Sequence, residues 1–304
     1  MKTETGAIKS APMKREALKR IPLRANPFLG LGDRVHWILF GLFLIQFALV
    51  WLNLWTSFPN FGKATLPQEH SGEQARWPDG LLLVLCAGTT VASLTRQLPG
   101  QNVMLASVII VFIAAIAHTL GATVAIPFGP YVYTDRIGQM LFHPLPWAVP
   151  VIWLVAILSS RGVARLVMRP WRKTRSYGFW VMGLTAGFVL LFDLGLEPYA
   201  TQVKQYWSWN RTNAGLFWHD TPWVNFLGWA ATALVILGFV TPSLINKKPV
   251  KQPSDFHPLM IWLLVNGLFL TGAIANHLWT AAAIEAAGMV TAGIFAVRGG
   301  TWQG

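Results

Sequence analysis

Long apolar stretches alternate with short polar segments along most of this chain. Eight of them approach the roughly 20 apolar residues that a helix needs to cross the hydrocarbon core of a bilayer. They lie at about 36–55, 79–96, 102–122, 146–168, 179–199, 222–245, 258–277 and 279–297. The pattern predicts an all-α polytopic membrane protein with about eight transmembrane helices. The last stretch is short, rich in Ala and Gly, and contains Glu285, so seven helices are the alternative.

Composition places the chain in the same class. Of its 304 residues, 54% are hydrophobic and 12% are charged, whereas a soluble domain carries about 25% charged residues. The chain is too apolar for a soluble globule or for a disordered protein. Its single cysteine, Cys86, excludes an intrachain disulfide and a thiolate metal cluster. We expect a basic cytoplasmic tail at 1–35 and a single transmembrane helical domain at 36–304.

Lysine and arginine are distributed unevenly between the two sets of loops. Basic residues of multi-pass proteins collect in cytoplasmic loops, and most of the 24 here lie in the N-terminal arm, in 161–175 and in 247–251. The bias favours an even number of helices with both termini inside, as in a bacterial plasma membrane. The net charge of +12 is then explained by topology and by contacts with anionic lipid headgroups. Without groove-reading motifs, we expect no nucleic-acid partner.

Ionisable residues within apolar helices are costly, so each is a candidate functional group. Asp193 and Glu197 are the clearest pair, because their i, i+4 spacing places them on one helix face. Two carboxyl groups this close in a low-dielectric setting cannot both ionise cheaply, so one keeps its proton and can act as a general acid. Alternatively, Glu197 reaches headgroup water and Asp193 pairs with Lys or His. His118 is a further candidate, unless it only bonds a neighbouring helix.

The segment 126–138, with the sequence IPFGPYVYTDRIG, is unlike a helix or a simple loop. Proline and glycine at this density interrupt a helix. Tyr131 and Tyr133 alternate along an extended chain and would point the same way. We expect a capping or re-entrant segment over an outward-facing pocket, since irregular backbone at membrane depth needs polar surroundings. An interfacial loop is the alternative.

No motif indicates a cofactor or a metal. The seven histidines are scattered without an HxxxH pair, and DDxxD motifs are absent. A P-loop, a Rossmann glycine pattern and a GxSxG elbow are absent as well. These absences argue against di-iron hydroxylases, prenyltransferases, nucleotide-dependent enzymes and serine hydrolases. We expect neither a metal nor a cofactor.

Several segments occur in an order that resembles a known family. The chain is similar to the CruF-like membrane proteins of carotenoid biosynthesis, which include gamma-carotene 1',2'-hydratases and bisanhydrobacterioruberin hydratases. The family's ExxG element corresponds to His118–Gly121, and its PFGxYxYT segment corresponds to Pro127–Thr134. Its Asp that is followed four residues later by Asp-Pro corresponds to Asp193–Pro198. Its aromatic W-x-W-like end corresponds to Tyr206–Trp209, and its N-F-x-G-W element corresponds to Asn225–Trp229. The match covers roughly residues 80–245. Two positions depart from the family, since His118 replaces Glu and Glu197 replaces Asp.

The resemblance implies a cofactor-independent hydratase. It would add water to the terminal C=C of an acyclic carotenoid that is taken from the lipid phase. Asp193 or Glu197 would protonate the double bond, and His118 or Asp135 would handle the water. The residues expected to bind the substrate, several of them aromatic faces that could stabilise a cation, are Phe128, Tyr131, Tyr133, Trp207, Trp209, Asn225 and Trp229.

Two other function classes stay open at this point. A carotenoid cyclase or isomerase would use the same acid but let an internal double bond capture the cation. A non-catalytic carotenoid- or lipid-binding membrane subunit would keep the aromatic residues without needing the acid. In each case, other enzymes of the carotenoid pathway are candidate partners.

Overall fold

The computed structural model describes residues 27–56, 77–210, 215–245 and 254–302. In this part of the chain, eight helices are long and apolar enough to cross a membrane. They are α1 (Pro27–Thr56), α2 (Trp77–Thr95), α3 (Gly100–Val124), α4 (Ala148–Val167), α5 (Tyr177–Pro198), α6 (Trp223–Val240), α7 (His257–Ala275) and α8 (Trp279–Gly300). The all-α polytopic fold is therefore confirmed, with the eighth helix present. Residues 1–26 of the expected tail lie outside the described residues, and α1 begins at Pro27, ahead of the predicted 36–55.

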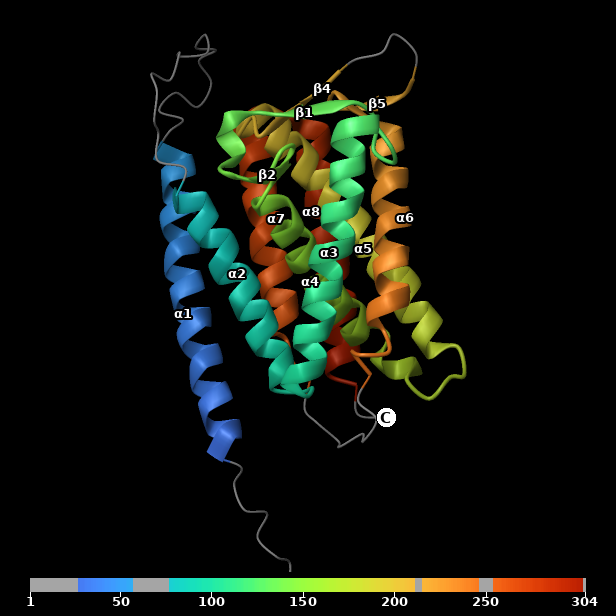
Figure 1. Ribbon diagram of the computed structural model, residues 1–304. Helices are drawn as coiled ribbons and strands as arrows, with labels where there is room; N and C mark the ends of the chain where they lie inside the picture. The colour runs from blue at the N-terminus through green and yellow to red at the C-terminus, as the bar shows by residue number, and fades with distance from the viewer. Residues whose placement is uncertain (1–26, 57–76, 211–214, 246–253, 303–304) are drawn as a thin grey trace, which may run out of the picture.

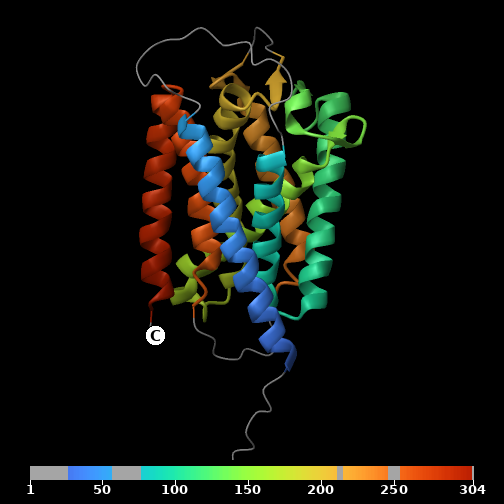
Figure 2. The same ribbon diagram turned by 90° about the vertical axis from the view of Figure 1, so that its left-hand side faces the viewer.

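Helix α4 is the centre of the bundle. It packs against α2, α3, α5, α7 and α8, and residues 153–161 are buried without interruption. A helix that is apolar on all sides is typical of a position surrounded by other helices. Helix α1, by contrast, packs mainly against α2 and lies at the edge of the bundle (Figures 1 and 2).

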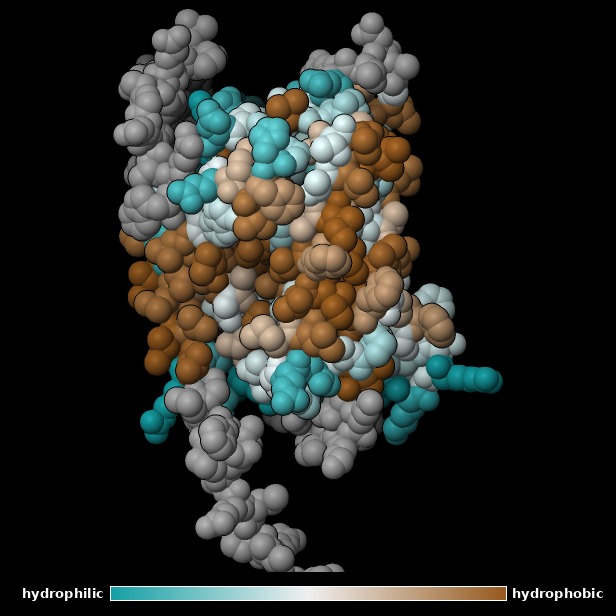
Figure 3. Space-filling model, in the orientation of Figure 1, coloured by the Kyte–Doolittle hydropathy of each residue, from teal (hydrophilic) through white to brown (hydrophobic). Residues whose placement is uncertain are grey.

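On the face shown in Figure 3, exposed apolar side chains form a band across the middle of the bundle, with hydrophilic residues at both ends. Large apolar side chains are exposed on several helices, among them Ile38 of α1, Phe112 of α3, Phe239 of α6 and Val290 of α8. Apolar side chains are stable in such a position only when hydrocarbon rather than water surrounds them. The chain is thus an integral membrane protein.

One end of the bundle is closed by a cap made from residues 126–147, 199–210 and 215–222. The strand β1 (Tyr131–Tyr133) pairs antiparallel with β4 (Trp207–Trp209), so that Tyr131 lies opposite Trp209 and Tyr133 opposite Trp207. The other strand pairs are β2 (Met140–Phe142) with β3 (Leu145–Pro146) and β5 (Phe217–Trp218) with β6 (Thr221–Pro222). The cap also contains the 3-10 turn η1 (Asp135–Ile137) and the π-helical turn η3 (Tyr199–Val203) that continues α5. Residues 126–138 thus form a capping segment, as their sequence predicts.

The opposite end is held by a polar cluster between α2 and the start of α7. The short turn η2 (Arg169–Trp171) follows α4 at this end. The Asp255 carboxylate accepts hydrogen bonds from Ser93 Oγ at 2.8 Å, from Gln97 Nε2 at 3.1 Å and from His257 Nδ1 at 2.6 Å. Burial alone would raise the pKa of Asp255, but the bonds from His257 and Ser93 outweigh it and lower the pKa to about 2. An ionised Asp255 therefore joins α2 to α7 at neutral pH.

Candidate functional site

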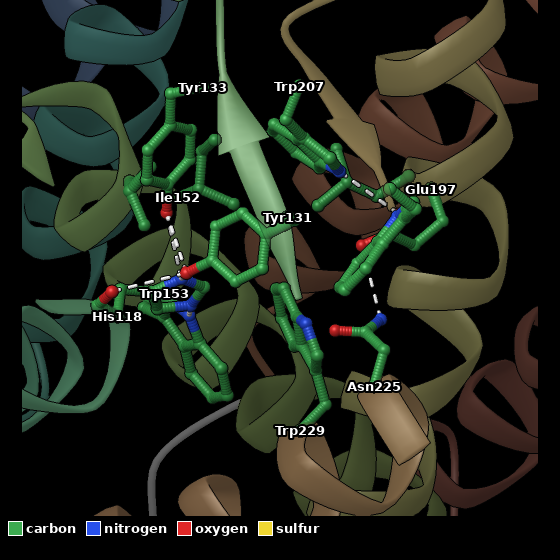
Figure 4. A pocket seen from close by; sticks show the side chains of 12 residues that line it. His118, Tyr131, Tyr133, Ile152, Trp153, Glu197, Trp207, Asn225 and Trp229 are labelled. Atoms are coloured by element: carbon green, nitrogen blue, oxygen red, sulfur yellow. Dashed lines mark hydrogen bonds between the residues drawn. The ribbon is translucent and has the colours of Figure 1, made fainter. Parts of the chain in front are cut away.

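A small cavity lies beneath the cap, where β1 and β4 meet α3, α4, α5 and α6 (Figure 4). Its volume of about 20 Å³ is enough for about one water molecule. Most of the predicted site residues meet at this space. Its lining consists of His118, Tyr131, Tyr133, Val149, Ile152, Trp153, Leu196, Glu197, Trp207, Trp209, Asn225 and Trp229.

Glu197 is the carboxyl group in the cavity wall, and four donors converge on it. Its Oε2 accepts hydrogen bonds from Trp207 Nε1 at 3.1 Å, Trp209 Nε1 at 2.9 Å and Thr221 Oγ1 at 3.0 Å. Its Oε1 accepts one from Asn225 Nδ2 at 3.1 Å. Hydrogen bonds to a carboxylate are stronger than those to a neutral acid. The surroundings are therefore arranged to stabilise the negative charge that remains when Glu197 gives up a proton.

Asp193 lies one turn earlier on the same face of α5 and is fully buried behind the cavity wall. The amide nitrogen of Asn225 bridges the pair, donating to Asp193 Oδ2 at 2.9 Å as well as to Glu197. Asp193 Oδ1 is buried and has no hydrogen-bond partner in the part of the chain described here. Burying an ionised oxygen without a donor is costly, so Asp193 keeps a proton of its own and stays neutral when Glu197 is ionised. Neither carboxyl reaches the surface.

His118 lies on the opposite side of the cavity from Glu197 (Figure 4). Trp153 Nε1 donates a hydrogen bond to His118 Nε2 at 2.7 Å. An indole N–H can only donate, so Nε2 carries no proton and the neutral ring carries its proton on Nδ1. That nitrogen faces the Tyr133 hydroxyl at 3.0 Å and the Tyr131 hydroxyl at 3.2 Å. In this arrangement His118 orients two phenols and has no free nitrogen to take a proton from water.

Aromatic rings line the space between His118 and Glu197. The rings of Trp153 and Trp229 are stacked with their centroids 4.1 Å apart, and the Tyr131 ring lies between the two sides of the cavity (Figure 4). Burial raises the pKa of both Tyr131 and Tyr133, so both phenols keep their protons at neutral pH. The cavity can therefore offer π faces to a cation and hydroxyl groups to a water molecule.

Besides Asp193, two predicted residues do not line the cavity. Asp135, which we expected to handle water, begins the turn η1 on the exposed side of the cap and does not line the cavity. Phe128 is fully buried behind His118, and the two rings stack with centroids 4.4 Å apart. Phe128 therefore packs against the histidine and does not line the cavity.

Five residues of the site were not singled out from the sequence: Val149, Ile152, Trp153, Leu196 and Thr221. Leu196 carried a usable signal, because it lies three residues after Asp193 and so turns toward the same side of the helix. Ile152 and Leu196 also line a second, larger pocket of about 640 Å³ between α2, α4, α5 and α7. Trp153 and Thr221 carried no signal in the sequence, since only tertiary packing brings them to His118 and Glu197.

Metal ligands do not converge in the described ranges of the chain. No group of three or more His, Cys, Asp or Glu side chains there is arranged to hold a metal ion. Both nitrogens of His118 already face protein partners. The chemistry of the cavity wall is thus that of a carboxyl group, phenols and indoles.

Residues 79–294 match the family described as carotenoid biosynthesis protein, which is more than half of the chain. Bisanhydrobacterioruberin hydratase of Haloarcula japonica is 25% identical to this chain over 161 residues. That alignment covers 51% of this chain and 50% of the relative, so the chain spans about half the length of the curated relative that it matches. No solved structure matches the chain.

Proposed function

The chain belongs to the carotenoid biosynthesis protein family, and on that premise we propose that it is a hydratase. It adds water to the terminal C=C of an acyclic carotenoid end group. The observation that carries this proposal is the cavity of about 20 Å³ with the buried Glu197 in its wall. Hydration consumes one water molecule and needs an acid beside it, and the cavity has room for one water molecule beside a carboxyl group. The similarity to a protein named as a hydratase supports the same reaction.

In the proposed reaction, protonated Glu197 gives its proton to the less substituted carbon of the double bond. The π electrons form the new C–H bond, and the neighbouring tertiary carbon becomes a cation. The oxygen of the cavity water then bonds to this carbon. The Glu197 carboxylate takes the proton that the bound water loses, so the acid is restored and one water has been added.

The hydrogen bonds around Glu197 favour this proton transfer. Trp207, Trp209 and Thr221 all donate to Oε2, and their bonds strengthen as the carboxyl becomes a carboxylate. Donors that are already in place where charge develops lower the barrier without reorganisation. Asp193 touches neither the cavity nor the substrate in this scheme. It is a positioning residue, which acts through Asn225 and stays neutral throughout, so that the proton given to the substrate comes from Glu197 alone.

The opposite wall of the cavity orients the water. His118 donates from Nδ1 toward the phenols of Tyr131 and Tyr133, whose hydroxyl groups line the cavity. The family resemblance has a glutamate at the position of His118. We propose that His118 acts here as a positioning residue for the two phenols, while Tyr131 and Trp229 present π faces to the cation.

The placement of charges supports an orientation in the membrane. Arg96 follows the end of α2, Arg165 lies in the last turn of α4, and Arg172 follows η2. These helix ends lie opposite the cap, where α1 also begins (Figure 1). By the positive-inside rule that end faces the cytoplasm, with both chain termini, and the cap faces outward. We propose a bacterial plasma membrane with anionic headgroups at the basic loops. The carotenoid comes from the lipid phase, where other enzymes of the pathway are candidate neighbours.

Pigment analysis tests the function. The chain is expressed in a host that accumulates lycopene and gamma-carotene, and the extract is separated by chromatography with mass detection. We expect a more polar product that is heavier by one water. A product of unchanged mass would refute hydration in favour of a cyclase or isomerase, and unmodified pigment that co-purifies with the protein would favour a binding subunit.

A pair of isosteric variants makes the test specific for the acid. Glu197→Gln should abolish the product, and Asp193→Asn combined with Glu197→Gln should leave pigment binding intact. Glu285→Gln is the matched control, because Glu285 is also a buried carboxyl, placed against Gly195 of α5, with no hydrogen-bond partner among the described residues. It should convert pigment at the rate of the unmodified protein.

A further inference from the structure

The larger pocket beside the cavity has a mostly apolar wall. It occupies about 640 Å³ between α2, α4, α5 and α7, a size typical of pockets that bind small organic molecules. Its apolar lining includes Leu82, Cys86, Val155, Phe192 and Leu268. Charged groups occur only where the pocket meets the cap, at Asp79 and Arg136. Most of its length therefore suits a hydrocarbon and has little to offer a polar ligand.

A single layer of side chains separates this pocket from the cavity. Ile152 and Leu196 line both spaces, and each precedes a residue of the cavity wall, Trp153 and Glu197. A hydrocarbon in the large pocket is therefore one aliphatic side chain away from Glu197. Rotamer changes of such side chains occur without backbone movement.

The pocket also reaches the apolar band on the outside of the bundle. Leu81 and Val84 of α2 line it and are at the same time 39% and 51% exposed. Exposed residues of an apolar helix at this depth face lipid and not water. A molecule dissolved in the membrane therefore meets the wall of the pocket directly.

We propose, on the basis of the hydratase function above, that this pocket binds the end segment of a linear polyene hydrocarbon. The polyene enters from the lipid past Leu81 and Val84. Ile152 and Leu196 then admit its terminal isoprene unit to Glu197. The side chains of Ile152 and Leu196 keep bulky groups out of the small cavity. The site therefore selects open-chain end groups over ring-closed ones and keeps the number of water molecules low.

Two valine variants test the route into the pocket, both made in the Glu197→Gln background so that turnover plays no part. The full chain is purified in nanodiscs, loaded with lycopene, and its bound pigment is measured by absorbance. Val84→Trp should lower the bound pigment roughly tenfold at limiting lycopene, by narrowing the mouth. Val108→Trp is the matched control, because Val108 of α3 is 58% exposed and lines neither space. It should bind as much pigment as the parent.

The single cysteine gives an independent readout. Cys86 lines the pocket as a free thiol, and bound lycopene should slow its modification by methyl methanethiosulfonate. If bound lycopene protects Cys86 from modification but the two valine variants bind equal amounts of pigment, the pocket is supported as the binding site and the route past Val84 is refuted. If the valine variants differ in bound pigment but Cys86 is not protected, the pigment lies on the outer surface of α2 and the pocket is refuted as the binding site. If the variants bind equally and Cys86 is not protected, the pocket and the route are both refuted. A hydrated product in cells together with either negative result would leave the proposed reaction standing.

Discussion

The hydrogen bonds from the two indoles to Glu197 make a sharp prediction about catalysis. Replacing Trp209 or Trp207 by Phe removes one N–H donor to Oε2 and keeps an aromatic ring at each position. The backbone pairing of β1 with β4 is unchanged, because it does not involve side chains. Each variant therefore separates the hydrogen bond from the π face.

The size of the effect follows from the charge that develops on Glu197. A hydrogen bond to a charged group is worth about 1.5–3 kcal/mol. If that energy is available mainly in the transition state, each Trp→Phe variant slows the reaction roughly 10- to 150-fold. The loss should fall on kcat with little change in KM, since an interaction made only in the transition state does not affect substrate binding.

The assay measures initial rates of carotenoid conversion in membranes, by chromatography with mass detection. Trp218→Phe is the matched control, because Trp218 Nε1 donates to the backbone oxygen of Leu194 at 3.1 Å. Leu194 belongs to α5, the helix that carries Glu197. That variant also loses one indole hydrogen bond to α5, but none to the carboxyl group. We expect its rate to stay within about twofold of the parent. A full rate for Trp209→Phe, or an equal loss for Trp218→Phe, would refute the role of these donors in proton transfer.

Three further predictions concern the support of the site and of the bundle. Trp153→Phe leaves the Nε2 of His118 buried and unpaired, so it should destabilise the fold by about 1–3 kcal/mol and slow hydration, as thermal unfolding and pigment conversion would show. Gly228→Ala places a methyl group 2.7 Å from a phenylalanine ring and 2.9 Å from a backbone oxygen, so it should lower the free energy of unfolding by about 1–3 kcal/mol. Gly238→Ala is the control, because a methyl group there meets nothing within 4 Å, and it should be neutral or stabilising by up to about 1 kcal/mol. Equal melting temperatures of the two variants would contradict this packing. Because the pKa of Asp255 is lowered to about 2, its ionised form stabilises the fold by about 2 kcal/mol above pH 4. The loss of stability in Asp255→Asn should therefore shrink as the pH falls from about 4 to about 2. A loss of stability that does not vary over this pH range would refute the link between the charge of Asp255 and folding.

The hydropathy pattern was enough to establish the membrane fold. Each helix needs only its own run of apolar residues and satisfies its backbone within itself, so its position can be recognised locally. The i, i+4 spacing of Asp193 and Glu197 and the alternation of Tyr131 with Tyr133 were equally local. In the structure the carboxyl pair shares Asn225, and both phenols face His118.

The division of roles within the site depended on tertiary structure. The sequence could not distinguish Glu197 in the cavity wall from Asp193 behind it, nor could it show that Asp135 lies outside, because all three are carboxyl groups near helix ends. Only the pairing of β1 with β4 carries Trp207 and Trp209 onto the carboxyl group, and only the packing of α4 against α3 brings Trp153 to His118.

What the sequence by itself determined was therefore the class of the protein, the positions of its helices and most of the residues that meet at the cavity. What only the tertiary structure decided was which carboxyl faces the cavity, which nitrogen of His118 carries the proton, and where a long apolar molecule can reach Glu197. The physical reason is the separation along the chain of the residues that interact. Hydrophobic burial and helical periodicity are written in neighbouring residues, whereas hydrogen-bond partners and cavities arise from segments far apart in the chain that packing brings together.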